Sequence, residues 1–253
     1  MAGFMYLLGI EDIYRHVTTK FLSRVEYTLP MAQTFFPTGT AVFDSLLRGY
    51  EGGVVTTIYG PSGSGKTTVC LLAALAALRS GKKVIYIDTE GGFSSMRFEQ
   101  LVGNDSIERL LEHLFLLKPL SFADQIKVLH RLKDLVNDGI GLILVDSISM
   151  QYRVALHGQD GVRSANAELG LQIAHLVEIA RKYTIPILLT SQVYADFDER
   201  DNIKMVGGDI VRYGSKCLVE LLKYKNARKA IIVKHRSLPE HKSIIFSIVE
   251  KGF

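Results

Sequence analysis

A glycine-rich stretch of eight residues has the types and spacing that bind phosphate. It consists of Gly60, Pro61, Ser62, Gly63, Ser64, Gly65, Lys66 and Thr67, and it fits the phosphate-loop pattern G-x-x-x-x-G-K-[ST]. The glycines allow a tight turn that points backbone N–H groups at phosphate oxygens, and a helix beginning there favours the anion. Lys66 can reach the β- and γ-phosphates, and the Thr67 hydroxyl is a ligand for Mg²⁺. With Thr68, the stretch predicts a site for ATP and Mg²⁺.

Two carboxylates follow strand-like apolar runs and supply acids to such a site. Asp146 ends the run 142–145 and has the form of an aspartate that organises Mg²⁺ beside a phosphate loop. Glu90 follows the run 83–88. If that strand neighbours the phosphate-loop strand, Glu90 points toward the γ-phosphate and orients or deprotonates the attacking water. On the residues alone, Glu90 fits a surface position equally well.

The elements that must position these residues alternate between two kinds of pattern. We expect strands over 54–59, 83–88, 142–146 and 185–190, and helices over 66–79, 122–137 and 166–183. This alternation indicates parallel βαβ units with ligands at the carboxyl ends of the strands. Three more strands, expected over 218–224, 229–235 and 244–249, follow one another without a helix. They predict antiparallel strands at one edge of the sheet.

Composition limits the class of protein. The chain has 253 residues, 47% of them hydrophobic, which excludes a disordered chain and supports one large core. Two cysteines make no disulfide framework, and the longest apolar stretch, 69–78, is too short to cross a bilayer. We therefore expect a cytoplasmic protein without a membrane segment. Residues 1–36 stand apart as an N-terminal extension, either a linker or a docking arm, before a core over 37–253.

Charge is distributed unevenly along the chain. The formal net charge is +4, but residues 216–242 hold eight basic and two acidic residues. Residues 194–209 hold five acidic and two basic residues. The basic segment fits either a solvated face or a contact with a polyanion.

Several ordered motifs over 36–253 resemble the RecA/RadA recombinase superfamily, and within it RadB, the short archaeal paralogue of RadA. The segments that carry the resemblance are DTEGGFS over 88–94 with Arg97, TSQV over 190–193, KHR over 234–236 before Pro239 and Glu240, and FSIVEKG over 246–252. The resemblance implies an α/β fold, a RecA-like P-loop ATPase core with a mostly parallel twisted sheet flanked by helices. It further implies a catalytic role for Glu90, γ-phosphate sensing by Gln192 and packing of Arg97 on the adenine.

The resemblance also implies contacts beyond the nucleotide. Lys234 and Arg236 are expected on one face of a strand, where such cations reach the nucleotide of a neighbouring subunit; solvated edge-strand charges are the alternative. A first DNA loop, expected over 151–163, offers candidates for phosphate contacts and base stacking, namely Arg153, His157, Arg163 and, for stacking, Tyr152. An ordinary surface loop fits these residues as well. The second DNA loop, 194–209, is acidic, which opposes phosphate binding.

The resemblance implies an accessory protein of DNA repair and homologous recombination. Such a protein binds ATP, Mg²⁺ and DNA, hydrolyses ATP weakly, and assists or regulates a RadA-type recombinase without exchanging strands itself. The sequence shows no counterpart of RadA's N-terminal domain and no clear Phe-x-x-Ala polymerisation motif. Long filaments are therefore not expected, and whether the protein forms a homo-oligomer is undecided. An active strand-exchange recombinase is the alternative. A signalling or motor ATPase similar to KaiC is a third, against which the DTEGGFS and KHR segments argue.

Overall fold

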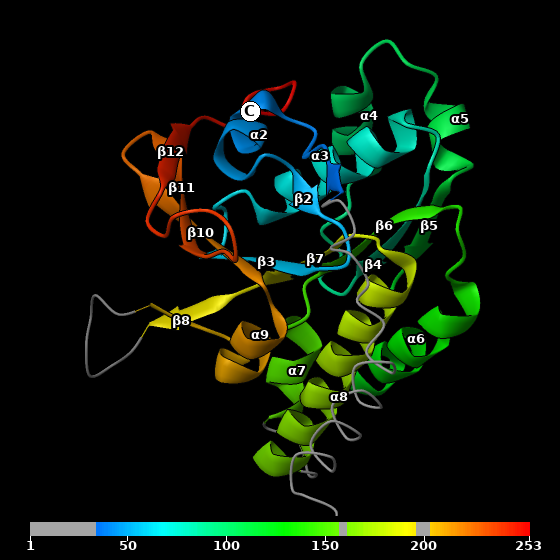
Figure 1. Ribbon diagram of the computed structural model, residues 1–253, viewed down its shortest axis with the longest axis vertical. Coiled ribbons are helices and arrows are strands. Elements are labelled where there is room, and N and C mark those ends of the chain that lie inside the picture. The colour runs from blue at the N-terminus through cyan, green and yellow to red at the C-terminus, as the bar shows by residue number, and fades with distance from the viewer. Residues whose placement is uncertain (1–33, 157–160, 196–202) are drawn as a thin grey trace, which may run out of the picture. The chain divides into compact units, whose positions relative to one another are not determined.

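The computed structural model describes residues 34–156, 161–195 and 203–253, and Thr34–Phe253 form one compact unit (Figure 1). The expected N-terminal extension lies outside the described residues up to position 33. Strand β1 (Phe35–Phe36) already belongs to the compact unit, because it pairs with β2 (Tyr50–Glu51).

An eight-stranded sheet forms the centre of the fold, in the order β12-β11-β10-β3-β7-β6-β4-β5. Its strands are β3 (Val55–Tyr59), β4 (Lys83–Asp88), β5 (Leu114–Leu117), β6 (Ile140–Asp146), β7 (Ile187–Ser191), β10 (Cys217–Tyr224), β11 (Ala227–Lys234) and β12 (Ser243–Phe246). All neighbours from β10 to β5 pair in parallel, whereas β11 and β12 pair antiparallel. This arrangement confirms the predicted mostly parallel α/β sheet with antiparallel strands at one edge.

Helices cover both faces of the sheet (Figure 1). One face carries α2 (Ala41–Leu47), α3 (Lys66–Arg79), α4 (Ser95–Val102) and α5 (Ile107–Leu111); the other carries α6 (Phe122–Leu135), α7 (Met150–Ala155), α8 (Gly161–Tyr183) and α9 (Gly208–Gly214). Side chains of one strand alternate between the two cores: Tyr86 of β4 packs in the first and Ile85 in the second. None of the helices in the described ranges is long and apolar enough to span a membrane.

Two features of the strand order go beyond what the sequence predicts. Strand β4 does not neighbour the phosphate-loop strand β3, because β7 and β6 lie between them. The first C-terminal strand, β10, pairs in parallel with β3, and antiparallel pairing begins at β11. The crossover helix α9 before β10 explains this, because a helical connection lets a strand return in the same direction. A small hairpin of β8 (Val193–Ala195) and β9 (Ile203–Met205) lies outside the main sheet.

Candidate nucleotide-binding site

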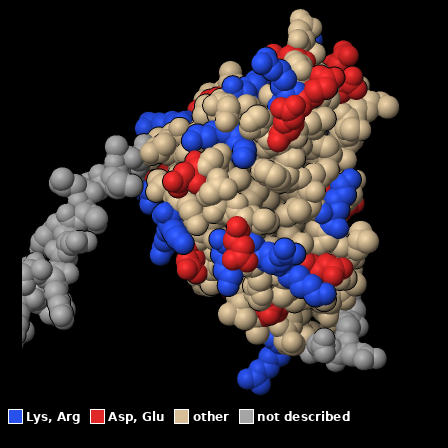
Figure 2. All heavy atoms as spheres, turned by 90° about the vertical axis from the view of Figure 1, so that its right-hand side faces the viewer, with Lys and Arg blue, Asp and Glu red and all other residues tan. Residues whose placement is uncertain are grey.

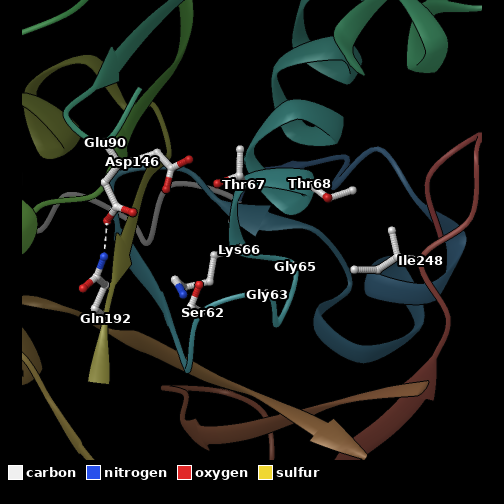
Figure 3. Close-up of a pocket in the computed structure, with 10 residues that line it drawn as sticks. All are labelled: Ser62, Gly63, Gly65, Lys66, Thr67, Thr68, Glu90, Asp146, Gln192 and Ile248. Carbon is white, nitrogen blue, oxygen red and sulfur yellow. Dashed lines mark hydrogen bonds between the residues drawn. The ribbon is translucent and has the colours of Figure 1, made fainter. Parts of the chain in front are cut away.

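The phosphate loop connects the carboxyl end of β3 to α3 and lines a pocket of about 260 Å³ (Figure 3). Helix α3 begins after Gly65, whose φ is 104°, and no side chain caps its first turn. The first N–H groups of the helix are therefore available to an anion, together with the positive end of the helix dipole. Gly60 has room for nothing larger, because a Cβ there would lie 2.2 Å from the carbonyl oxygen of Leu221.

Lys66 brings a positive charge to this loop. Its ammonium donates to the carbonyl oxygens of Gly60, at 2.8 Å, and Pro61, at 3.0 Å. Burial lowers the pKa of Lys66, and the carboxylates of Glu90 and Asp146 partly oppose that shift. The two carbonyl contacts hold the ammonium inside the turn that phosphate oxygens would occupy. Thr67 and Thr68 also line the pocket, and the buried Ser64 hydroxyl has no partner among the described residues.

Asp146 lies at the carboxyl end of β6, on the side of the pocket away from Gly65 (Figure 3). Thr190 donates to it at 2.5 Å, Tyr86 donates at 3.1 Å, and Thr67 also bonds it. Burial raises the pKa of Asp146, and these bonds counteract the shift. The pair of Asp146 and Thr67 fits Mg²⁺, which takes oxygen ligands and is commonly held by one carboxylate together with substrate phosphates. Within the described ranges, no cluster of three His, Cys, Asp or Glu offers a cage made by protein alone.

Glu90 and Gln192 meet at the same end of the pocket, although they follow different strands, β4 and β7. The Gln192 amide donates to Glu90 Oε1 at 3.0 Å (Figure 3), and Ser147 donates a short hydrogen bond to the same oxygen. Glu90 reaches the pocket without a direct strand neighbour in β3, because the carboxyl ends of parallel strands share one edge of the sheet. The structure therefore brings Glu90, Gln192, Asp146 and Lys66 together in the lining of one pocket.

Residues that the sequence analysis did not single out shape this edge. Asp88 is buried and accepts from the backbone N–H groups of Gly92, at 3.0 Å, and Phe93, at 3.1 Å, which folds the loop after Glu90. Thr89 bonds both the N–H and the carbonyl of Ser147, at 3.0 and 2.7 Å. Polar residues follow β4 and β6 directly in the sequence. Since the carboxyl ends of the strands carry the site in such sheets, this pattern indicates that these residues belong to the site.

Arg97 lies beside the pocket rather than in its lining. Its guanidinium donates to the carbonyl oxygens of Val249 and Glu250, both at 2.7 Å, and to Gln100 at 3.0 Å. The apolar residue that does line this end is Ile248, at the far side of Gly65 from Glu90 (Figure 3). In this structure Arg97 fixes the segment that carries Ile248, and its packing on an adenine stays a prediction.

The described residues of the expected first DNA loop belong largely to α7 and α8, and one of the loop's assignments is wrong. Tyr152 lies in α7, is 6% exposed, and donates to Asn166 at 2.6 Å, so it is not available to stack on a base. Its ring packs toward Phe122 instead. Arg153 and Arg163 are exposed, whereas His157 lies outside the described residues.

On the face that carries α5, β5 and α6, Lys and Arg are interspersed with Asp and Glu (Figure 2).

The two cations expected to act across an interface have partners within their own chain. Lys234 ends β11 and donates to the carbonyl oxygens of Arg212, at 2.9 Å, and Ser215, at 2.7 Å. Burial and neighbouring cations lower the pKa of Lys234. Arg236 lies beyond the strand, so the two do not alternate on one strand face as expected. Its guanidinium forms an ion pair with Glu51, a carboxylate that is only 4% exposed.

Comparison with known proteins identifies the class. A family model described as Rad51 matches residues 33–253, so the chain belongs to the Rad51 family. Within it, the chain is similar to the DNA repair and recombination protein RadB of Methanoculleus marisnigri, 42% identical over 219 residues, covering 85% of this chain and 95% of that protein. RadB of Methanobrevibacter smithii is 38% identical over 225 residues, covering 85% and 94%. A crystal structure of the RadB recombinase matches with a TM-score of 0.72 and 38% identity, covering 86% of this chain and 97% of that one.

Proposed function

We propose that the chain acts in DNA repair and recombination as an ATP-binding accessory protein of the RadB type. The observation that carries this proposal is the pocket that joins the phosphate loop to Glu90, Asp146 and Gln192. The similarity to RadB proteins over most of the chain supports the biological setting. The protein would bind ATP with Mg²⁺ and hydrolyse it slowly.

The residues have distinct roles in this hydrolysis. The N–H groups of the phosphate loop and Lys66 hold the phosphates. Thr67 and Asp146 would hold Mg²⁺, which would supply positive charge beside the phosphate oxygens. Glu90 orients a water molecule and accepts its proton as the water oxygen bonds to the γ-phosphorus and the bond to the bridging oxygen of ADP breaks. Gln192, bonded to Glu90, is placed to contact the γ-phosphate. Hydrolysis is slow because, in the described part of the chain, the pocket lining holds Lys66 as its one cationic side chain.

Contacts with DNA and a recombinase complete the proposal. Arg153 and Arg163 are exposed and are the described cations offered for phosphate contacts. Few such cations and an acidic second loop predict weak DNA binding, and the salt dependence of that binding scales with the small number of phosphates that the cations neutralise. We therefore assign strand exchange to a RadA-type partner, which this protein assists or regulates.

The nucleotide site is tested with Lys66→Ala. Lys66 exchanges its two carbonyl contacts for charged phosphate contacts, a net difference of about 3 kcal/mol, or roughly 150-fold in Kd for ATP. Lys82→Ala removes an exposed lysine in the turn between α3 and β4, and it serves as the matched control. Calorimetry that finds unchanged ATP affinity in Lys66→Ala contradicts the site.

The accessory role is tested by three measurements on the purified protein: DNA binding against salt, strand exchange alone, and capture of a RadA-type recombinase with and without ATP. We expect salt-sensitive DNA binding, little strand exchange, and capture of the recombinase. Efficient strand exchange by the protein alone contradicts the accessory role. Absence of DNA binding at low salt contradicts the DNA-directed function.

A further inference from the structure

A closed ring of hydrogen bonds joins Glu90 and Gln192 through two serines. The Gln192 backbone N–H donates to Ser149 at 3.0 Å, and Ser149 donates to Ser147 at 3.4 Å. Ser147 then donates to Glu90 Oε1, which also accepts from the Gln192 amide at 3.0 Å. The ring thus begins and ends on Gln192 and contains the carboxylate proposed to activate water.

The direction of each bond in the ring is fixed. The Ser147 oxygen accepts from the backbone N–H of Met150, at 3.2 Å, as well as from Ser149. Its own proton is therefore committed to Glu90. Ser147 and Ser149 are 0% and 1% exposed, so water does not compete for the buried bond between the two serines, whereas the contact of Gln192 with Glu90 is exposed. In such an interior a hydrogen bond is stronger than in water, and linked bonds polarise one another.

The backbone of Ser147 is itself held against the strand end that carries Glu90. Thr89 bonds the Ser147 N–H and carbonyl, and the Thr89 N–H donates to the carbonyl of Asp146 at 2.9 Å. Strands β4 and β6 are paired up to Asp88 and Asp146. The position of the serine hydroxyl is consequently fixed by the backbone. The Glu90 side chain is exposed and has several rotatable bonds, so its carboxylate depends on hydrogen bonds for a defined position.

We propose that Ser147 and Ser149 are positioning residues for hydrolysis, which fix the Glu90 carboxylate in register with Gln192. The inference rests on the proposed ATPase function and adds residues to it. A base displaced by about 1 Å typically costs on the order of 100-fold in rate. Removal of the Ser147 hydroxyl takes away one of the two donors to Glu90 Oε1. We therefore expect the single-turnover rate of ATP hydrolysis to fall roughly 10- to 100-fold, while the affinity for ATP stays within about twofold of the wild type.

A double-mutant cycle tests whether Ser147 acts through Glu90. Ser147→Ala is measured alone and in a Glu90→Gln background, where we expect no further loss of rate. Ser215→Ala is the matched control, since Ser215 is also fully buried but bonds Thr57 and the carbonyl of Val211 outside the ring. Ser149→Ala provides a second variant, with a smaller expected loss of about 3- to 10-fold because it acts through Ser147.

Crystal structures of the wild type and Ser147→Ala without nucleotide give a readout that is independent of activity. We expect the contact between Glu90 and Gln192 to be lost in the variant. Equal losses from Ser147→Ala in both backgrounds, an unchanged rate, or a retained contact overturns the inference. Wild-type protein that binds ATP but does not hydrolyse it refutes the proposed ATPase function instead, and the crystal structures then decide alone whether Ser147 holds the carboxylate.

Discussion

Replacement of Arg236 by alanine distinguishes a role within the subunit from a role across an interface. Arg236 donates from Nε to Glu51 Oε2 at 2.7 Å, and its Nη2 pairs with Oε1. The Glu51 side chain is 4% exposed and that of Arg236 is 46% exposed. Without Arg236, Glu51 is left as a buried carboxylate that lacks its counter-ion.

The magnitude follows from this geometry. Removal of one partner of a fully buried ion pair costs about 3–5 kcal/mol. Because the guanidinium is half exposed and screened by water, we expect about 2 kcal/mol in the free energy of unfolding. For a unit of this size, that loss lowers Tm by roughly 4–8 °C.

The assay is urea unfolding followed by circular dichroism, with ATP turnover measured over a range of protein concentrations. Arg236→Ala combined with Glu51→Gln should recover much of the lost stability, since the neutral amide does not need a counter-ion. Arg109→Ala, at an exposed arginine of α5, is the control and should change the free energy of unfolding by less than about 0.5 kcal/mol. If Arg236→Ala leaves the free energy of unfolding unchanged but abolishes a rise of ATP turnover with protein concentration, the reasoning is refuted. That result favours a role of Arg236 across a subunit interface.

Three further predictions concern catalysis, DNA and pH. Glu90→Gln should lower hydrolysis by about 100-fold or more while ATP affinity in calorimetry stays within about twofold; equal activity contradicts the proposed base. Arg153→Ala and Arg163→Ala should each reduce the salt slope of DNA binding by about 1, and an unchanged slope in a fluorescence titration removes that residue from the interface. Burial lowers the pKa of His175 below its ordinary value of 6.5, so the unfolded chain binds its proton more readily. Stability should fall as the pH drops below about 6.5, and His175→Asn should flatten that dependence in urea unfolding.

Local pattern predicts the elements that build the phosphate site. Helix α3 and strand β4 have the expected bounds, because a glycine loop and uninterrupted apolar runs define their ends. Glu90 reaches the pocket although its strand is not adjacent to β3. The rule that parallel strands share a carboxyl edge is thus sufficient for the site, even where the strand order is not predicted.

The features that local pattern does not predict depend on distant partners. Arg236 pairs with Glu51, 185 positions away, and Ser147 bonds Glu90, 57 positions away. In the sequence, Tyr152 has the features of an aromatic residue in a loop. Its packing against Phe122 and its hydrogen bond to Asn166 depend on residues that the local pattern does not connect to it. Strand β5 is a run of four apolar residues, too short for its period to distinguish a strand from a helix.

The position of β3 in the sheet has a consequence for how the protein folds. Its two neighbours are β7 (Ile187–Ser191) and β10 (Cys217–Tyr224), both more than a hundred residues later in the chain. Closing such long loops is entropically costly, and a fold rich in these contacts acquires its structure slowly. During synthesis on a ribosome, the strand that leads into the phosphate loop must wait for most of the chain to emerge. Nucleotide binding is therefore a late event in folding, and a nascent chain that ends before β7 should not bind ATP.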